Sequence, residues 1–163
     1  MSSTTASLTE WAQSNISKIF ELSTDSSEKD NLQQLFETVF ATNVQILMNH
    51  ETISLDEFKG RISKTFATSN ASVEWKEVME VPAENGTDEK QVGIVAGFFV
   101  LTRSMTFRIR AAPAQNNTSV TVSAKIEHHE SAQPDEHGDR RRIVNLILTS
   151  GTKAAPVHLH GRS

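Results

Sequence analysis

The densest set of side chains that could do chemistry lies between residues 127 and 142, EHHESAQPDEHGDRRR. This stretch holds His128, His129 and His137, together with several carboxylates and three consecutive arginines. Such a set could bind a metal ion or exchange protons, or it could form a solvated turn between two strands. Because adjacent residues of a strand point to opposite faces, His128 and His129 cannot readily bind one metal ion. We therefore expect no metal site here.

The two halves of this stretch have different surroundings. His128 continues an alternating apolar row, so we expect it to point toward the core, where an imidazole could exchange protons; the row consists of Val120, Val122, Ala124 and Ile126. Residues 131–139 contain Pro and Gly, which favours a polar turn with His137 in water. The arginines at 140–142 are predicted to be solvated and to open the last strand.

A second candidate is Glu77, in the segment SVEWKEVMEV at 72–81. Strict alternation places it in one row with the apolar side chains of Val73, Trp75, Met79 and Val81. A carboxylate held in that row would be desolvated and could donate or accept a proton. The alternative is a glutamate at a twist or bulge of the sheet edge, in contact with water or with an arginine. If their strands meet, Glu77 and His128 could form an acid–base pair.

The composition indicates a single globular domain. Of the 163 residues, 37% are apolar and 22% are charged, which suffices to bury a core. The net charge of −4 argues against nucleic acid as a partner, and the chain has no run of about 18 apolar residues that would span a membrane. Cysteine and tyrosine are absent, which excludes disulfides, thiolate ligands, a cysteine nucleophile and phenolic acids. No glycine-rich phosphate loop or dinucleotide motif occurs, so we expect no cofactor. The N-terminus lacks the features of a signal peptide, so we expect a cytoplasmic protein.

The first part of the chain has helical periodicity. Ser7 and Glu10 have the spacing of a capping box, and an apolar stripe follows them: Leu8, Trp11, Ala12, Ile16, Ile19 and Phe20. A second helix is predicted from the stripe Leu32, Leu35, Phe36, Val39 and Phe40. A third is predicted after Ser54 and Glu57, with the stripe Leu55, Phe58, Ile62 and Phe66. Residues 44–49, VQILMN, are predicted to form a short strand between the helices.

From residue 72 onward the apolar period changes to two, which predicts four long antiparallel strands at 72–81, 91–101, 119–129 and 141–150. The segment PAQNNT before the third of these is predicted to be a turn. Two strands, 91–101 and 141–150, are apolar on both faces and need a cover on each side. Gly93 and Gly97 would let the sheet bend sharply. We expect one domain over residues 1–150 and a tail over 151–163.

The order of these elements, with FETVFATNVQILMNHETISLDEFKGRISKTF leading into SVEWKEVMEV, resembles the nuclear transport factor 2-like (SnoaL-like) superfamily over about residues 7–150, and its small fungal members in particular. The resemblance implies an α+β cone, in which a curved antiparallel sheet wraps over N-terminal helices and leaves an open pocket. It also implies a homodimer through the open sheet face. In enzymes of the superfamily an acid or base projects after the second helix, where this chain offers Asn49, His50 and Glu51 but no aspartate; these residues could equally be a turn.

Two functional classes follow from these observations. A binding or interaction protein is favoured because no complete set of catalytic residues can be recognised in the sequence. Its cavity would accept a small hydrophobic ligand, and the candidate lining residues are Trp11, Phe36, Phe40, Asn49, Trp75, Phe98 and Phe99. The alternative is a cofactor-independent dehydratase, isomerase or cyclase acting on a polyketide- or terpenoid-like molecule. In that case Glu77 or His128 would be the general acid or base, and His50 or Asn49 a polar orienting group. Whether Glu77, His128 and His50 converge in one pocket separates the two classes.

Overall fold

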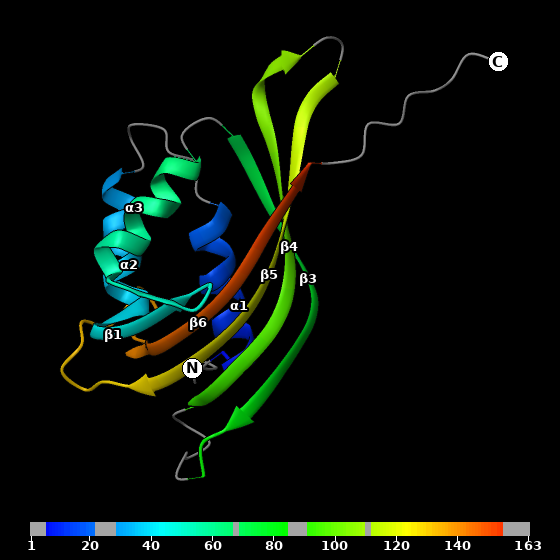
Figure 1. Ribbon diagram of the computed structural model, residues 1–163. Coiled ribbons are helices and arrows are strands. Elements are labelled where there is room, and N and C mark those ends of the chain that lie inside the picture. Colours follow the sequence, from blue (N-terminus) through cyan, green and yellow to red (C-terminus); the bar gives the residue numbers. More distant parts are fainter. Residues whose placement is uncertain (1–5, 22–28, 67–68, 85–90, 110–111, 155–163) are drawn as a thin grey trace.

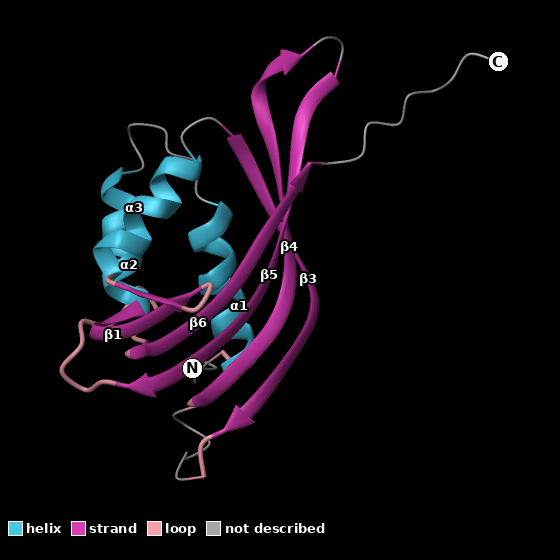
Figure 2. Ribbon diagram, viewed as in Figure 1, coloured by secondary structure: helices cyan, strands magenta, loops and turns pink. Residues whose placement is uncertain are grey.

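A computed structural model describes residues 6–21, 29–66, 69–84, 91–109 and 112–154 (Figure 1). In this part of the chain three helices lie on one side of a six-stranded sheet that curves around them (Figure 2). No described element covers the other side of the sheet. The described helices are all too short or too polar to cross a membrane. The predicted α+β class, with a curved sheet wrapped over N-terminal helices, is confirmed.

The elements follow the predicted order with one addition, a short strand before the third helix. The helices are α1 (Leu8–Glu21), α2 (Lys29–Val39) and α3 (Leu55–Phe66). The strands are β1 (Phe40–Met48), β2 (Glu51–Ile53), β3 (Ser69–Pro82), β4 (Gly93–Ile109), β5 (Ala112–His128) and β6 (Arg141–Ala154). They are arranged in the order β2-β1-β6-β5-β4-β3; β1 runs parallel to β6, and the other described pairs are antiparallel.

Both predicted helix caps are present. The backbone N–H of Ser7 donates to Glu10 Oε2 at 2.9 Å, and the N–H of Glu10 donates to Ser7 Oγ at 3.2 Å, which closes a capping box at the start of α1. The Oγ of Ser54 accepts from the N–H of Glu57 at 3.1 Å at the start of α3. These caps satisfy N–H groups that have no partner within the helix, so they set where α1 and α3 begin.

The core lies between the helices and the concave face of the sheet. α1 buries the whole stripe that was predicted for it, against β3 and β4. Aromatic rings fill the interior in two groups: Phe36, Phe40 and Phe58 under α2 and α3, and Phe20, Trp75 and Phe99 under α1. The indole N–H of Trp75 donates to Ser17 Oγ at 2.9 Å and ties β3 to α1. The interior is thus closed by rings packed on one another.

A β-bulge in β3 changes which side chains face the core. Trp75 pairs with Phe99 and Glu77 pairs with Phe98, so Lys76 is an extra residue in β3. Beyond it the alternation is inverted: Val78 packs against the core, while Glu77 is exposed on the opposite face. The predicted row shared by Glu77 and Trp75 is therefore wrong, because that prediction assumed an uninterrupted strand.

Three boundaries differ from the predictions. β1 begins at Phe40, the residue predicted to end the second helical stripe. β5 begins at Ala112, so PAQNNT is part of a strand and the predicted turn is wrong; β4 and β5 extend beyond the helices as a long hairpin (Figure 1). β6 continues to Ala154, into the segment predicted as a tail.

Candidate functional site

The face of the sheet turned away from the helices, here called the outer sheet face, carries exposed apolar side chains. Met79, Val81, Ile94 and Ile147 are 62%, 56%, 38% and 45% exposed. The strand register places Val81 opposite Ile94, with Met79 two residues before Val81 on the same face; Ile147 lies in the same cross-strand row as Met79, three strands away, beyond Ala96 and Ser123. Exposed apolar side chains gathered on one face of a folded domain are typical of a surface that another molecule covers.

Small side chains occupy the middle of the outer sheet face. On this side β5 presents Ser119, Thr121 and Ser123, between the larger residues of β4 and β6. Phe98 of β4, opposite Thr121, is half-buried there, on the reverse side of the sheet from the fully buried Phe99. Phe98 and Ile147 therefore stand above the small residues of β5, whereas Ala96, Thr149 and Gly151 beside β5 are small as well.

Charged side chains on the outer sheet face are balanced in sign. Lys76 pairs with Glu74 at 2.8 Å and Lys125 with Glu127 at 3.5 Å, while Glu77 and Lys153 are also exposed on strands of this face. Each pair is solvent-exposed and contributes little to the stability of the protomer. Together these residues supply three carboxylates and three amines, so they add no net charge to this face and would not repel an identical set.

The interior of the cone holds a small pocket. A space of about 140 Å³ lies between α3 and the sheet, and residues of both polar and apolar type line it, among them Phe58, Leu101, Arg103 and Ser150. Burial lowers the pKa of the Arg103 guanidinium. A second, larger cleft lies between α1, α2 and the segment that joins β5 to β6. Of the residues predicted to line an apolar cavity, only Trp11 borders either of these two spaces.

Most of the other residues that were predicted to contact a ligand instead pack in the core or bind the backbone. Phe36, Phe40 and Phe99 are almost fully buried among other rings, and Trp75 packs on Phe99 with 4.8 Å between ring centroids. Asn49 lies in the turn between β1 and β2, at φ 51°, and its Oδ1 accepts from the backbone N–H of Ser150 at 2.8 Å. The structure therefore places these side chains in the core or the backbone framework of the cone.

The three candidate acid–base residues do not meet. Glu77 is exposed on the outer sheet face, and His50 is exposed in the β1–β2 turn at φ 66°. His128 lies opposite Arg141 at the start of β6, whereas His50 adjoins the region of β6 near Ser150, roughly 30 Å further along the strand at about 3.3 Å per residue. The arrangement required by the predicted acid–base mechanism is absent from the described residues.

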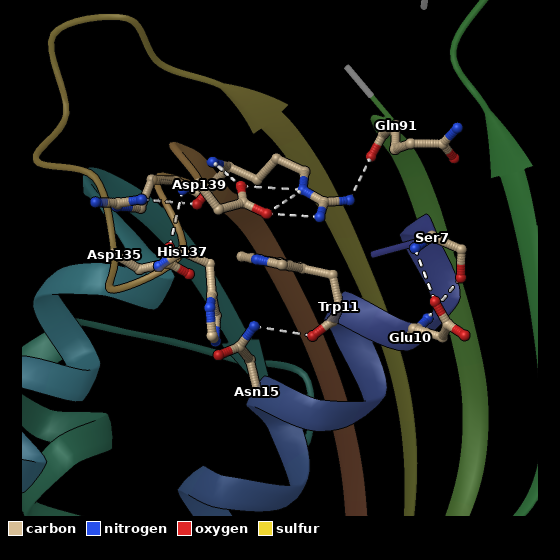
Figure 3. A network of polar contacts seen from close by, with 10 residues as sticks. Ser7, Glu10, Trp11, Asn15, Gln91, Asp135, His137 and Asp139 are labelled. Carbon is tan, nitrogen blue, oxygen red and sulfur yellow. Dashed lines mark hydrogen bonds and ion pairs between the residues drawn. The ribbon is translucent and has the colours of Figure 1, made fainter. Parts of the chain in front are cut away.

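The arginines predicted to be solvated include two that are buried. The Arg141 guanidinium donates to both carboxylate oxygens of Asp139, at 2.6–3.1 Å, and to the Gln91 carbonyl at 3.2 Å, and it lies 5.4 Å from the Trp11 ring (Figure 3). Arg142 donates to the backbone carbonyls of Glu37, Gln133 and Arg141. The prediction is wrong for both residues, because these bonds hold the β5–β6 segment against α1, α2 and β4. His137, by contrast, is exposed in the loop as predicted.

The Asp139–Arg141 pair makes the free energy of unfolding depend on pH. Burial by itself raises the pKa of Asp139, but the hydrogen bonds and charge of Arg141 outweigh it and hold the pKa below its ordinary value of 3.8. A lowered folded-state pKa means that the pair stabilises the protein above about pH 4 and ceases to do so as the pH falls through the folded pKa. We expect the difference in unfolding free energy between wild type and Asp139→Asn to shrink between pH 6 and pH 3 in urea titrations. A difference that is constant over this range would contradict this assignment.

The sequence and the fold were compared with known proteins. No family model matches the sequence, and no curated protein sequence does. Among solved structures, Mtr2 of Candida albicans is similar in fold: it is 12% identical, the match covers 91% of this chain and 95% of that one, and the TM-score is 0.53. A nuclear transport factor 2-like protein of unknown function from an Exiguobacterium species is 16% identical over 85% of this chain and 97% of that one, with a TM-score of 0.48. At these identities the likeness concerns the fold alone, and the chain shares the fold of Mtr2.

Proposed function

We propose that this chain is an interaction protein that pairs with a second copy of itself through the outer sheet face. The observation that carries the proposal is the cluster of Met79, Val81, Ile94 and Ile147, which the protomer leaves exposed on one face. Burying apolar area stabilises an association by roughly 25 cal/mol per Å², before the entropic costs of binding. A protein that only had to remain monomeric would gain nothing from this cluster.

A second copy suits this face better than a strongly charged partner. The face carries carboxylates and amines in equal number, so two copies can meet without net repulsion. The small side chains of β5, Ser119 to Ser123, allow close approach at the centre of the sheet. An isologous pair uses the same patch twice, which a neutral and apolar patch permits.

Two finer predictions remain part of the proposal. The resemblance to the SnoaL-like group and its small fungal members rests on the order of elements, and we propose it together with a cytoplasmic location. The enzyme alternative has less support, because Glu77, His128 and His50 lie on different faces and ends of the sheet. The space of about 140 Å³ beside Phe58 and Arg103 is small for a hydrophobic ligand.

The test is the mass in solution of the wild type and of Ile147→Glu, by size-exclusion chromatography with light scattering. The wild type should be a dimer at micromolar concentration. Ile147→Glu should weaken the dimer by at least about 100-fold, because a carboxylate would be buried without a partner in an apolar contact. Since Ile147 is 45% exposed, the protomer should keep its circular dichroism spectrum.

The matched control is Ser131→Glu. It adds the same charge at an exposed position in the β5–β6 loop, away from the outer sheet face, and should leave the dimer intact. A wild type that is monomeric at all concentrations tested would refute the homodimer. A dimer that Ile147→Glu leaves unchanged would refute the outer sheet face as its interface.

A further inference from the structure

The larger cleft, of about 820 Å³, lies on the helical side of the molecule, away from the outer sheet face. One face of α1 forms its first wall, with Ser14, Asn15 and Lys18 at helical spacing. One face of α2 forms the second wall, with Asn31 and Gln34, and the third wall is the loop that joins β5 to β6. The size falls within the range of small-molecule sites, and most of the lining residues carry a polar or charged side chain.

Three of the cleft's four carboxylates accept hydrogen bonds from within the protein, and the fourth, Glu136, is exposed beside His137 at 3.5 Å. Glu10 accepts from the backbone N–H of Ser7 at 2.9 Å. Asp135 accepts from the N–H groups of His137 and Asp139 at 2.8 and 2.9 Å, and Asp139 is bound by Arg141. These hydrogen bonds hold the negative charges in the walls and leave them poorly placed to bind a ligand cation.

Two of the cleft's three arginine and lysine side chains are in the opposite situation, while the third, Arg141, is bound to Asp139. The side chains of Lys18 and Arg140 are exposed, and within the described residues no hydrogen bond or ion pair joins either to another group. His128 also lines the cleft, and its Nδ1 is buried without a hydrogen-bond partner among the residues that the structure describes. A buried polar atom without a partner is costly, and a ligand oxygen or hydroxyl would satisfy it.

We propose that this cleft binds a small hydroxylated organic anion. Lys18, Arg140 and His128 would hold its phosphate or carboxylate group through charge-assisted hydrogen bonds. The amides of Asn31 and Gln34 and the hydroxyl of Ser14 would bind its hydroxyl groups, since amides donate and accept. His137 of the loop and Asn15 of α1 point toward one another across this space (Figure 3). This site is independent of the pairing of two copies through the outer sheet face.

The test is thermal denaturation and titration calorimetry with four probes: inorganic phosphate, glucose 6-phosphate, gluconate and neutral glucose, each at constant ionic strength set with potassium chloride. A saturable rise in melting temperature with glucose 6-phosphate or gluconate supports the proposal. A response to glucose 6-phosphate alone assigns the anionic group as phosphate, and a response to gluconate alone assigns it as carboxylate. Equal responses to glucose and to the anions, or no saturable response to any probe up to about 10 mM, would overturn it.

Variants locate the site. Lys18→Gln and Arg140→Gln remove exposed charges without disturbing the core, and each should weaken binding of the responding probe about tenfold. Lys64→Gln, an equivalent change in the last turn of α3 and outside the cleft, should leave the affinity unchanged. Equal affinity of Lys18→Gln, Arg140→Gln and the wild type would also overturn the proposal.

Discussion

Replacing Arg141 with methionine should lower the free energy of unfolding by about 3 kcal/mol or more, because it leaves a largely buried carboxylate unpaired. The side chain of Arg141 is 1% exposed and that of Asp139 is 13% exposed, so water cannot readily replace the guanidinium. Methionine retains much of the packing on Trp11 but none of the side-chain hydrogen bonds to Asp139 and Gln91. Urea unfolding at pH 7, followed by tryptophan fluorescence, measures the loss.

The double variant Arg141→Met/Asp139→Asn separates charge from packing. In the wild type Asp139 Oδ1 accepts from the backbone N–H of residue 141 at 2.9 Å. Asparagine keeps an oxygen that can accept this hydrogen bond, and it carries no charge. The double variant should therefore be more stable than Arg141→Met alone. If Arg141→Met lowered the free energy of unfolding by less than about 1 kcal/mol, the pair would contribute no more than an exposed surface ion pair, and the prediction would be wrong.

Replacing Gly97 with alanine should lower the free energy of unfolding by about 1–3 kcal/mol through overpacking. A Cβ on Gly97 would lie 2.7 Å from the carbonyl oxygen of Glu77 and 2.8 Å from Cζ3 of Trp75. The first of these is backbone in the bulge, and the second is a ring held against Phe99 and bonded to Ser17. Neither can move without disturbing the register that places Glu77 and Met79 on the outer sheet face.

Gly60→Ala is the matched control. Gly60 lies within α3, and a Cβ there would meet nothing within 4 Å. Alanine should raise the free energy of unfolding by about 0.5–1 kcal/mol, because it restricts the unfolded chain and favours the helix. If Gly97→Ala proved as stable as the wild type, Trp75 would not be packed on β4 as described.

Much of the fold could be predicted from the sequence, because periodicity and caps act locally. The stripe from Leu8 to Phe20 and the capping residues Ser7 and Ser54 each specify a helix without reference to the rest of the chain. The four long strands also followed from the period of two. The apolar character of 91–101 and 143–149 on both faces indicated that a second cover is needed, and Ile94 and Ile147 of these strands are exposed.

What could not be predicted depended on contacts distant in the sequence. A single extra residue, Lys76, inverts the faces of β3, and it is placed by the pairing with β4 rather than by any local signal. For the same reason Met79 was assigned to the core and is exposed. Arg141 resembled a surface charge because its partners, Gln91 and Trp11, lie far away in the chain; only Asp139, two residues before it, gave a local hint.

The claim that two copies cover the outer sheet face is tested most directly by the rate at which Met79 is oxidised by dilute hydrogen peroxide, measured by peptide mass spectrometry over a range of protein concentrations. In the protomer Met79 is 62% exposed, so an uncovered sulfur should react readily. We predict slow oxidation at high concentration, faster oxidation on dilution, and the fast rate at every concentration for Ile147→Glu. A rate for wild-type Met79 that is independent of concentration and equal to that of Ile147→Glu would contradict the account.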